Sequence, residues 1–187
     1  MDAPASLEVV AAAAAAPGAA AAVAVEVASP ADAPAIFALI NDAYEVETGT
    51  QGVAFKKTPR LDAVADVEAM MAAETLVKAT RGGALVGAMA YSFTGAGYCY
   101  FGPFAVDRRA QGAGVGRALL RHVEAVARGR SARGLEITVV CCRSDILPMY
   151  IRDGFVEVGE EPFPDPWRIA DERRGQIWMR VLRKDFA

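Results

Sequence analysis

Residues 104–117 of the chain read Phe104-Ala105-Val106-Asp107-Arg108-Arg109-Ala110-Gln111-Gly112-Ala113-Gly114-Val115-Gly116-Arg117. The run begins like a β-strand, passes through a turn dense in glycine and then opens a helix. Glycines at alternating positions remove side chains from the turn, so backbone N–H groups can approach a bound group closely. The first turn of a helix adds unpaired N–H groups and positive potential. We therefore expect these residues to cradle an anion such as a diphosphate.

Two well-known phosphate loops do not fit this segment. A dinucleotide-binding GxGxxG pattern starting at Gly112 would need glycine where Arg117 stands, and the chain has no GK[ST] sequence for a nucleotide triphosphate. A turn that serves backbone geometry alone remains the simpler alternative, because short glycine motifs often occur by chance. The nearby Arg108 and Arg109 are more typical of solvated surface residues than of phosphate ligands.

The sequence on either side of this loop alternates between strand and helix patterns. Alternating valines predict a strand over 23–27, and Ser29-Pro30-Ala31-Asp32 is typical of a helix start. Helices are expected from Pro30 to about Tyr44, over about 64–71 and over about 114–128, with a short one ending near Arg152. Residues 45–60 are expected to form a long connection. Further strands are expected over 75–80, 84–93, 98–106, 135–141, 155–158 and 176–182. This order predicts an α/β (α+β) fold, with a mixed sheet and helices on its faces.

The amino-acid composition argues against several classes of protein. The 187 residues suit one domain, and 20 Lys and Arg against 23 Asp and Glu give a net charge of -3. Such a balance argues against a nucleic-acid partner. The single histidine, His122, and three cysteines, Cys99, Cys141 and Cys142, do not supply a His-rich metal site or a disulfide framework. We expect no metal, and we expect the cysteines to pack as small hydrophobic residues within strands.

The first residues of the chain form a segment of their own. Residues 1–21 are rich in alanine, interrupted by Pro17 and Gly18, and we expect them to be a disordered tail. Alanine is too weakly apolar for a membrane span, and no Lys or Arg precedes Lys56, so neither an anchor nor a targeting peptide is favoured. We therefore expect a cytoplasmic protein without a membrane partner, although an organelle stays open.

Two motifs together resemble the GCN5-related N-acetyltransferase (GNAT) superfamily. Its loop signature places Gln or Arg, then Gly, then Gly or Ala where this chain has Gln111, Gly114 and Gly116. Its second signature, Tyr-x-x-x-Gly-Phe, is met by Tyr150, Gly154 and Phe155, after the strand that follows the loop helix. The resemblance covers residues 22–183, so 22–187 is expected to be one N-acetyltransferase domain. It implies a mostly antiparallel sheet in which two parallel strands splay apart.

The resemblance also implies where acetyl-coenzyme A binds. In this family it lies in the gap between the splayed strands, and Gly102-Pro103 is a plausible kink in the first of them. The main chain of 104–106 would meet the pantetheine arm and that of the loop would hold the pyrophosphate. The implied cofactor-binding residues are Phe104, Ala105, Val106, Gln111, Gly112, Ala113, Gly114, Val115, Gly116 and Arg117.

The chemistry implied is attack of a neutral amine on a thioester carbonyl, without a covalent enzyme intermediate. Tyr150 resembles the family's general acid, or its hydrogen-bond donor to the leaving sulfur, although packing beneath the cofactor is the simpler role. A strand N–H near Phe104 would stabilise the oxyanion. Many relatives have a basic carboxylate on the strand entering the cleft, and residues 98–101 have none, so Glu45, Glu47 or an ordered water remain candidates.

The acceptor is expected to be a primary amine on a small molecule. Tyr44 and Arg143 are the candidate substrate-binding residues, and Arg143 stands where many members have asparagine. Lys56, Lys57 and Arg60 would add a cationic wall if the connection after the first helix lines the acceptor side. A peptide or protein amine and a non-catalytic coenzyme A-binding module are the alternatives, and the chain is expected to be a monomer or a homodimer.

Overall fold

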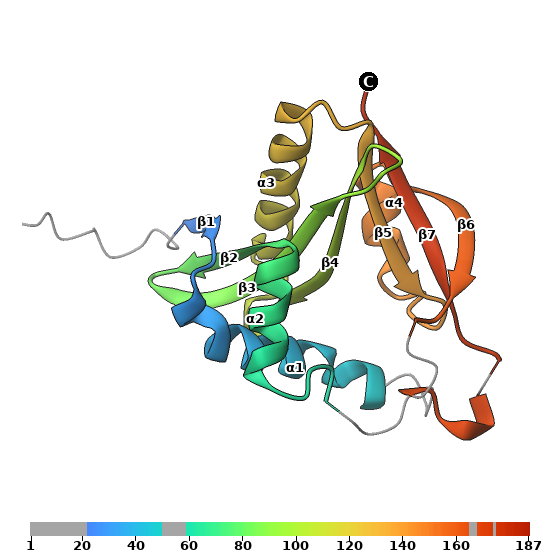
Figure 1. The fold of residues 1–187 in the computed structure, drawn as a ribbon, viewed down its shortest axis with the longest axis horizontal. Coiled ribbons are helices and arrows are strands. Elements are labelled where there is room, and N and C mark those ends of the chain that lie inside the picture. The colour runs from blue at the N-terminus through green and yellow to red at the C-terminus, as the bar shows by residue number, and fades with distance from the viewer. Residues whose placement is uncertain (1–21, 50–58, 165–167, 174) are drawn as a thin grey trace, which may run out of the picture.

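A computed structural model describes residues 22–49, 59–164, 168–173 and 175–187, and the expected tail over 1–21 lies outside them. The described elements, in chain order, are β1 (Val23–Val27), α1 (Ala33–Gly49), α2 (Val64–Ala73), β2 (Thr75–Arg81), β3 (Ala84–Phe93), β4 (Tyr98–Val106), α3 (Val115–Gly129), β5 (Gly134–Val140), α4 (Leu147–Arg152), β6 (Val156–Pro162) and β7 (Trp178–Asp185) (Figure 1). These elements match the expected alternation, with ends shifted by a few residues.

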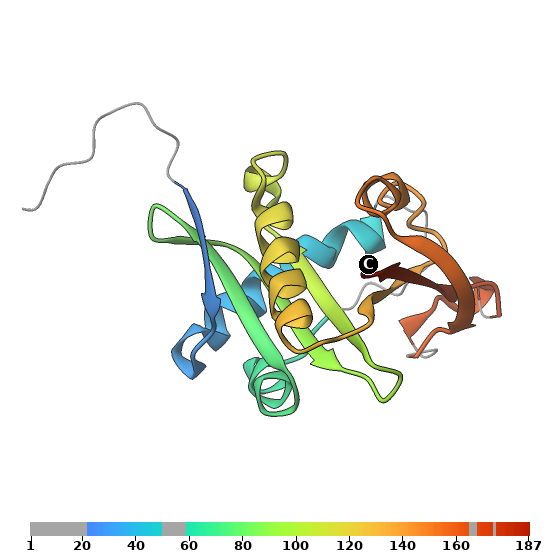
Figure 2. The ribbon, with the colours of Figure 1, turned by 90° about the horizontal axis from the view of Figure 1, so that it is seen from above.

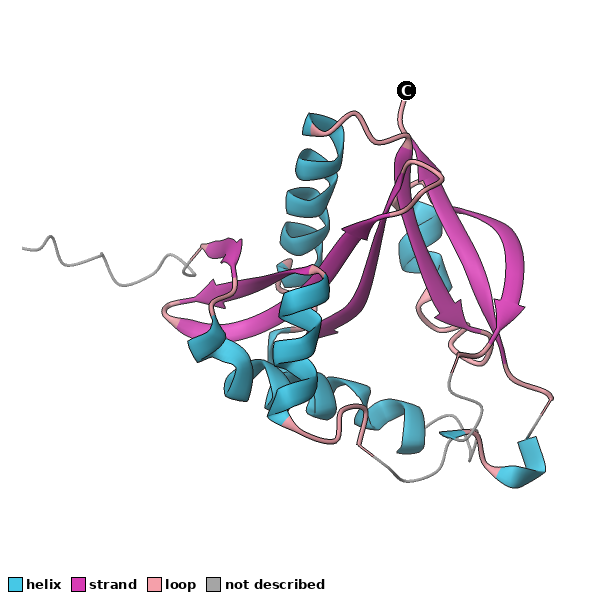
Figure 3. Cartoon of the chain, viewed as in Figure 1, coloured by secondary structure: helices cyan, strands magenta, loops and turns pink. Residues whose placement is uncertain are grey.

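The strands form one seven-stranded sheet in the order β1-β2-β3-β4-β5-β7-β6. Every neighbouring pair is antiparallel except β4 and β5, which run parallel. Figure 3 shows the helices lying against this sheet, and Figure 2 shows α3 crossing over the strands on one side. The predicted fold class is therefore confirmed.

The parallel pair holds together over a short length only. Its register runs from Tyr98 opposite Gly134 to Tyr100 opposite Glu136, and both strands then continue unpaired with each other. Pro103 lies just beyond the last pair and has no N–H to donate, so it does not extend the ladder. Figure 1 shows β4 and β5 diverging from their joined ends. The expected splay is present, and it leaves main-chain groups of both strands available.

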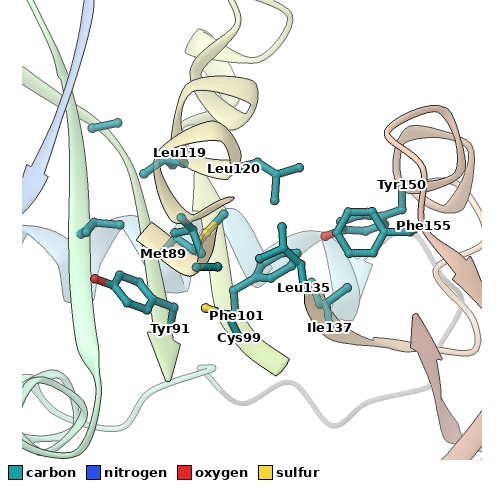
Figure 4. Packing of buried hydrophobic residues seen from close by; sticks show 14 of the residues in the cluster. Met89, Tyr91, Cys99, Phe101, Leu119, Leu120, Leu135, Ile137, Tyr150 and Phe155 are labelled. Carbon is teal, nitrogen blue, oxygen red and sulfur yellow. The ribbon is translucent and has the colours of Figure 1, made fainter. Parts of the chain in front are cut away.

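Two hydrophobic clusters cover the two faces of the sheet. One packs α3 against the strands, with Leu119 and Phe101 fully buried (Figure 4), and the other packs α1 and α2 against the opposite face, around Ile36 and Ile40. The approach of α3 is close, because a Cβ added at Gly87 of β3 would lie 2.9 Å from both Leu119 Cδ1 and Val115 Cγ1. Packing of α3 thus fixes where its first turn meets β4.

Two local predictions are wrong. Residues 45–49, expected to begin a long connection, continue α1 as far as Gly49. Nothing in 45–48 interrupts a helix, and Arg108 holds this part of α1 by donating to the Asp42 carbonyl at 2.7 Å and to Glu45 Oε2 at 3.2 Å. Cys141 and Cys142 lie in the turn after β5 rather than in a strand, although Cys99 is buried within β4 as expected.

Candidate active site

The glycine loop joins β4 to α3 in a conformation that exposes its main chain. Gly112 and Gly114 have φ angles of +76° and +83°, which favour glycine, and Gly114 is the N-cap of α3. A Cβ at either position would meet nothing within 4 Å, and residues 111–114 are all exposed. The loop is therefore an open surface of backbone.

The start of α3 adds donors beside this surface. The N–H groups of its first residues have no acceptor within the helix. Gly116 lies against β4, since a Cβ there would be 3.1 Å from Phe104 Cζ. The helix start is thus packed onto the strand that borders the gap. The N–H groups of Gln111 and Ala113 donate within the turn, at 3.4 Å to the Arg108 carbonyl and 3.3 Å to the Ala110 carbonyl. The N–H groups of Gly112, Gly114 and the first turn of α3, beside the opening between the strands, fit the diphosphate of a nucleotide such as coenzyme A.

The arginines near the loop have different surroundings. Arg108 is engaged with α1, where it donates to the Asp42 carbonyl and to Glu45 Oε2. Arg109 and Arg117 are exposed, and the Asp107 carboxylate accepts from the Arg109 N–H at 2.8 Å. The loop thus presents backbone rather than a fixed cationic side chain.

Tyr150 is placed by the turn that ends α4. Gly154 has a φ of +94°, which ends the helix, and the Phe155 N–H then donates to the Tyr150 carbonyl at 3.0 Å. This turn brings the two rings edge to face at 5.6 Å, and Phe101 of β4 lies 6.5 Å from the Tyr150 ring. Figure 4 shows the Tyr150 hydroxyl pointing away from α4, towards Phe101 and Leu135. The Tyr-x-x-x-Gly-Phe motif therefore anchors a phenol beside the gap.

Burial is the main reason why the pKa of Tyr150 is raised well above the ordinary tyrosine value. Tyr44 and Tyr100 raise this pKa further, whereas the Arg143 guanidinium lowers it. These residues come from α1, β4 and the segment after β5, and all of them lie near enough to Tyr150 to act on its charge. Tyr150 is therefore a hydrogen-bond donor over the whole neutral pH range.

Both candidate substrate-binding residues lie at this gap. The hydroxyl of Tyr44 accepts a hydrogen bond from the Phe104 N–H at 3.2 Å, and Arg60 stacks over the Tyr44 ring, 5.5 Å from its centroid. Arg143 forms a bidentate ion pair with Asp145, at 2.9 and 3.1 Å. Lys56 and Lys57 lie outside the described residues.

One pair of hydroxyls at the gap has no counterpart among the sequence predictions. The hydroxyls of Tyr100, in the last backbone pair of β4 with β5, and of Thr138, two residues beyond that pair on β5, are hydrogen bonded at 2.9 Å. Alternation along β4 could have placed Tyr100 on the face opposite Cys99 and Phe101, but not its partner on β5. The pair bridges the strands where their backbones separate.

Glu74 is a carboxylate that the sequence predictions also missed. It follows α2 in extended conformation, one residue before Thr75 of β2, and strand register places it level with Ser92 and Tyr100 on the face covered by α1 and α2. Its Oε2 atom is buried without a hydrogen-bond partner among the described residues, and burial raises the pKa of this carboxyl. The charge of Glu74 acts on the Tyr100 pKa, so the two side chains are near one another.

Glu45, one of the earlier candidates for a base, has a weaker position than Glu74. Glu45 is 68% exposed and paired with Arg108, and the side chain of Glu47 lies outside the described part of the structure. Among the residues that the structure describes, no three His, Cys, Asp or Glu side chains gather as they would around a metal ion. No helix in the described chain is long and apolar enough to span a membrane.

Comparison with solved structures shows the same fold in several acetyltransferases. A ribosomal-protein-alanine N-acetyltransferase from Brucella melitensis is 21% identical, with a TM-score of 0.66 over 87% of this chain and 99% of that one. An IAA acetyltransferase from Bacillus cereus is 18% identical, with a TM-score of 0.63 over 88% and 100%. A candidate streptothricin acetyltransferase from Bacillus anthracis, solved with acetyl coenzyme A, is 16% identical, with a TM-score of 0.53 over 61% and 63%. At these identities the likeness concerns the fold.

A sheet that splits between two parallel strands, beside a glycine loop that opens a helix, is the arrangement that the resemblance to N-acetyltransferases implied. The model of the acetyltransferase (GNAT) family matches residues 34–155, a range that contains both the glycine loop and the Tyr150 motif. No curated protein sequence matches the chain at a significant level. The chain belongs to the GNAT family of acetyl-CoA-dependent N-acetyltransferases.

Proposed function

We propose that this enzyme transfers the acetyl group of acetyl-CoA directly to a primary amine of a small molecule. The observation that carries the proposal is the exposed main chain of 111–114 beside the start of α3, at the opening between β4 and β5. There the pyrophosphate is held by N–H groups, and the acetyl group reaches into the gap. The main chain of Phe104, Ala105 and Val106 supports the pantetheine arm, and the Phe104 N–H faces the thioester oxygen.

Tyr150 serves the leaving group in this proposal. When the amine nitrogen bonds to the carbonyl carbon and the carbon–sulfur bond breaks, coenzyme A leaves as a thiolate. A thiol has a pKa of about 8.5, far below that of a buried tyrosine, so full proton transfer from Tyr150 to the sulfur is uphill. Donation of a hydrogen bond to the forming thiolate stabilises it without that cost. Tyr150 therefore acts as a donor more than as an acid.

Glu74 is the described carboxylate best suited to take the proton of the amine. An aliphatic ammonium with a pKa of about 10.4 has to lose a proton before its nitrogen can attack. Burial disfavours the charged form of Glu74, which makes it a stronger base than an exposed glutamate. It lies on the face of the sheet lined by α1 and α2, opposite the face occupied by α3.

A link between two segments supports a small acceptor. Arg168, which precedes β7, donates to the Pro59 carbonyl at 2.5 Å and lies 3.9 Å from Asp62, just before α2. Its side chain is only 12% exposed. The link ties the segment after α1 to the one before β7, on the side where Tyr44 and Arg60 lie. A bridged surface suits a small amine better than an extended peptide.

A panel of amines tests this proposal by release of free thiol from acetyl-CoA. We expect turnover with at least one class of small primary amine, and weaker turnover with peptides that begin with alanine. The second candidate function, acetylation of a protein amine, is suggested by the fold shared with ribosomal-protein-alanine acetyltransferases. Preference for the peptides would favour it. Binding of CoA with no turnover on any amine would favour a non-catalytic module.

A further inference from the structure

The Phe104 N–H has a partner in this structure that competes with its proposed one. The proposed function assigns this donor to the thioester oxygen, and it donates here to the Tyr44 hydroxyl at 3.2 Å. A single N–H makes one strong, well-directed hydrogen bond. The Tyr44 phenol oxygen and the thioester oxygen therefore compete to accept the hydrogen bond of the Phe104 N–H.

The position of Tyr44 is built into the fold. Asn41, one turn earlier on α1, accepts from the Leu61 N–H at 2.8 Å and donates to the Leu61 carbonyl at 3.1 Å. This fixes the segment before α2 against α1, and its Arg60 lies over the Tyr44 ring. The phenol is thus held at β4 from both its own helix and the following segment.

We propose that Tyr44 is a specificity-determining residue that sets how this enzyme discriminates acetyl-CoA from CoA. The inference rests on the proposed function. The thioester oxygen of acetyl-CoA has to displace the Tyr44 hydroxyl from the Phe104 N–H. The hydrogen bond gained by the thioester is therefore offset by the hydrogen bond that Tyr44 loses. CoA ends in a thiol, has no carbonyl to place there, and leaves the Tyr44 contact intact. Tyr44 therefore weakens binding of the acetylated form selectively.

Calorimetric titration of CoA and acetyl-CoA into the wild type and Tyr44→Phe measures this selectivity without any acceptor. Tyr44→Phe removes the hydroxyl that accepts from Phe104 and keeps the ring. We expect the Kd of acetyl-CoA to fall about 2- to 10-fold, the net value of one hydrogen bond, while the Kd of CoA stays within about twofold. Tyr98→Phe is the matched control, because its hydroxyl donates to Asp185 at 2.7 Å, at the joined ends of β4 and β5. It leaves both Kd values unchanged.

Each other outcome counts against the proposal. An unchanged ratio of the two Kd values overturns it, and so does an equal change in both. Weaker binding of acetyl-CoA alone would mean that Tyr44 donates to the thioester rather than competing with it. If Tyr44→Phe lowers the melting temperature, Tyr44→Leu should show the same change in ratio. If the wild type binds neither ligand, the proposed function itself fails and this inference falls with it.

Discussion

At the residue scale, Tyr150 shows how burial selects a chemical role. The same packing against Phe101 and Phe155 that fixes the ring also raises the pKa of the hydroxyl, because an anion would be poorly solvated there. A phenol with a raised pKa stays protonated and can donate a hydrogen bond to a neighbouring atom. The residue therefore suits stabilisation of a thiolate better than transfer of a proton.

Replacing Tyr150 with Phe should lower kcat about 100-fold, the usual effect of losing one donor to a developing charge. The KM for acetyl-CoA should change less than about threefold, since the ring and its packing remain. Steady-state kinetics across a range of pH values checks both numbers. A wild-type kcat would assign Tyr150 to packing alone.

Glu74 links activity to stability at a single residue. Its folded pKa is raised by burial, so the folded state binds the proton more tightly than the unfolded chain does. The free energy of unfolding therefore falls as the pH rises from the unfolded pKa through the folded one. A buried carboxylate that lowers the free energy of unfolding in this way is typical of a functional site.

Glu74→Gln should lower kcat/KM by about 100-fold or more, because a general base is lost. The same variant should melt at or above the wild-type temperature at pH 7 to 8, and the difference should shrink towards about pH 4, where a free glutamate titrates. Kinetics and melting curves over pH check the two effects. Glu68→Gln, on the exposed side of α2, is the control. Full activity in Glu74→Gln would exclude it as the base.

At the element scale, the contact of α3 with the sheet decides where the glycine loop lies. Gly87 lets the helix approach β3, and Gly116 lets its first turn approach Phe104 on β4. The loop between them then has its main chain exposed at the gap. The packing of α3 therefore determines the position of the glycine loop as much as the loop sequence does.

Gly87→Ala should therefore weaken both folding and CoA binding. The new methyl group would be 2.9 Å from two side chains of α3, so the helix has to move, at a cost of about 1–3 kcal/mol. We expect a lower melting temperature and a higher Kd for CoA. Gly95→Ala is the control, since a Cβ there meets nothing within 4 Å. Unchanged CoA affinity in Gly87→Ala would separate the cradle from helix packing.

The sequence was informative where the chemistry needs a local pattern. Glycines at alternating positions carry their own geometry, so the loop could be predicted from the residues themselves. Tyr150 was expected only because its motif resembles a family signature. The contacts of Tyr44 with Phe104, of Arg108 with α1 and of Tyr100 with Thr138 join residues far apart in the chain. Glu74 has no motif at all. Such pairs follow from tertiary packing, which periodicity does not encode.

At the scale of the whole molecule, two parts of the sheet meet along a short seam. β1 to β4 form one part and β5 to β7 the other, joined by the paired residues from Tyr98 to Tyr100. Side-chain links supplement the seam, among them the Tyr98–Asp185 bond at the joined ends, the Tyr100–Thr138 bond within the gap and the Arg168–Pro59 bond farther out. The outer link spans the side assigned to the acceptor.

Arg168→Ala should therefore disturb the acceptor more than the cofactor. We expect the KM for the amine to rise about 10-fold, as for loss of a hydrogen bond from a charged group, with the Kd of CoA within about twofold of wild type. Arg121→Ala, on the exposed side of α3, is the control. Equal losses for amine and CoA would show that the link supports the whole fold and not the acceptor side.

The most direct measurement is a titration of CoA into Ala113→Glu and Ala113→Gln. Ala113 is exposed in the loop and does not have a positive φ, so neither side chain strains the backbone. If bare N–H groups of this loop hold the pyrophosphate, the added carboxylate should weaken CoA binding at least about 10-fold relative to the neutral glutamine. Equal affinity in the two variants would show that the pyrophosphate lies elsewhere.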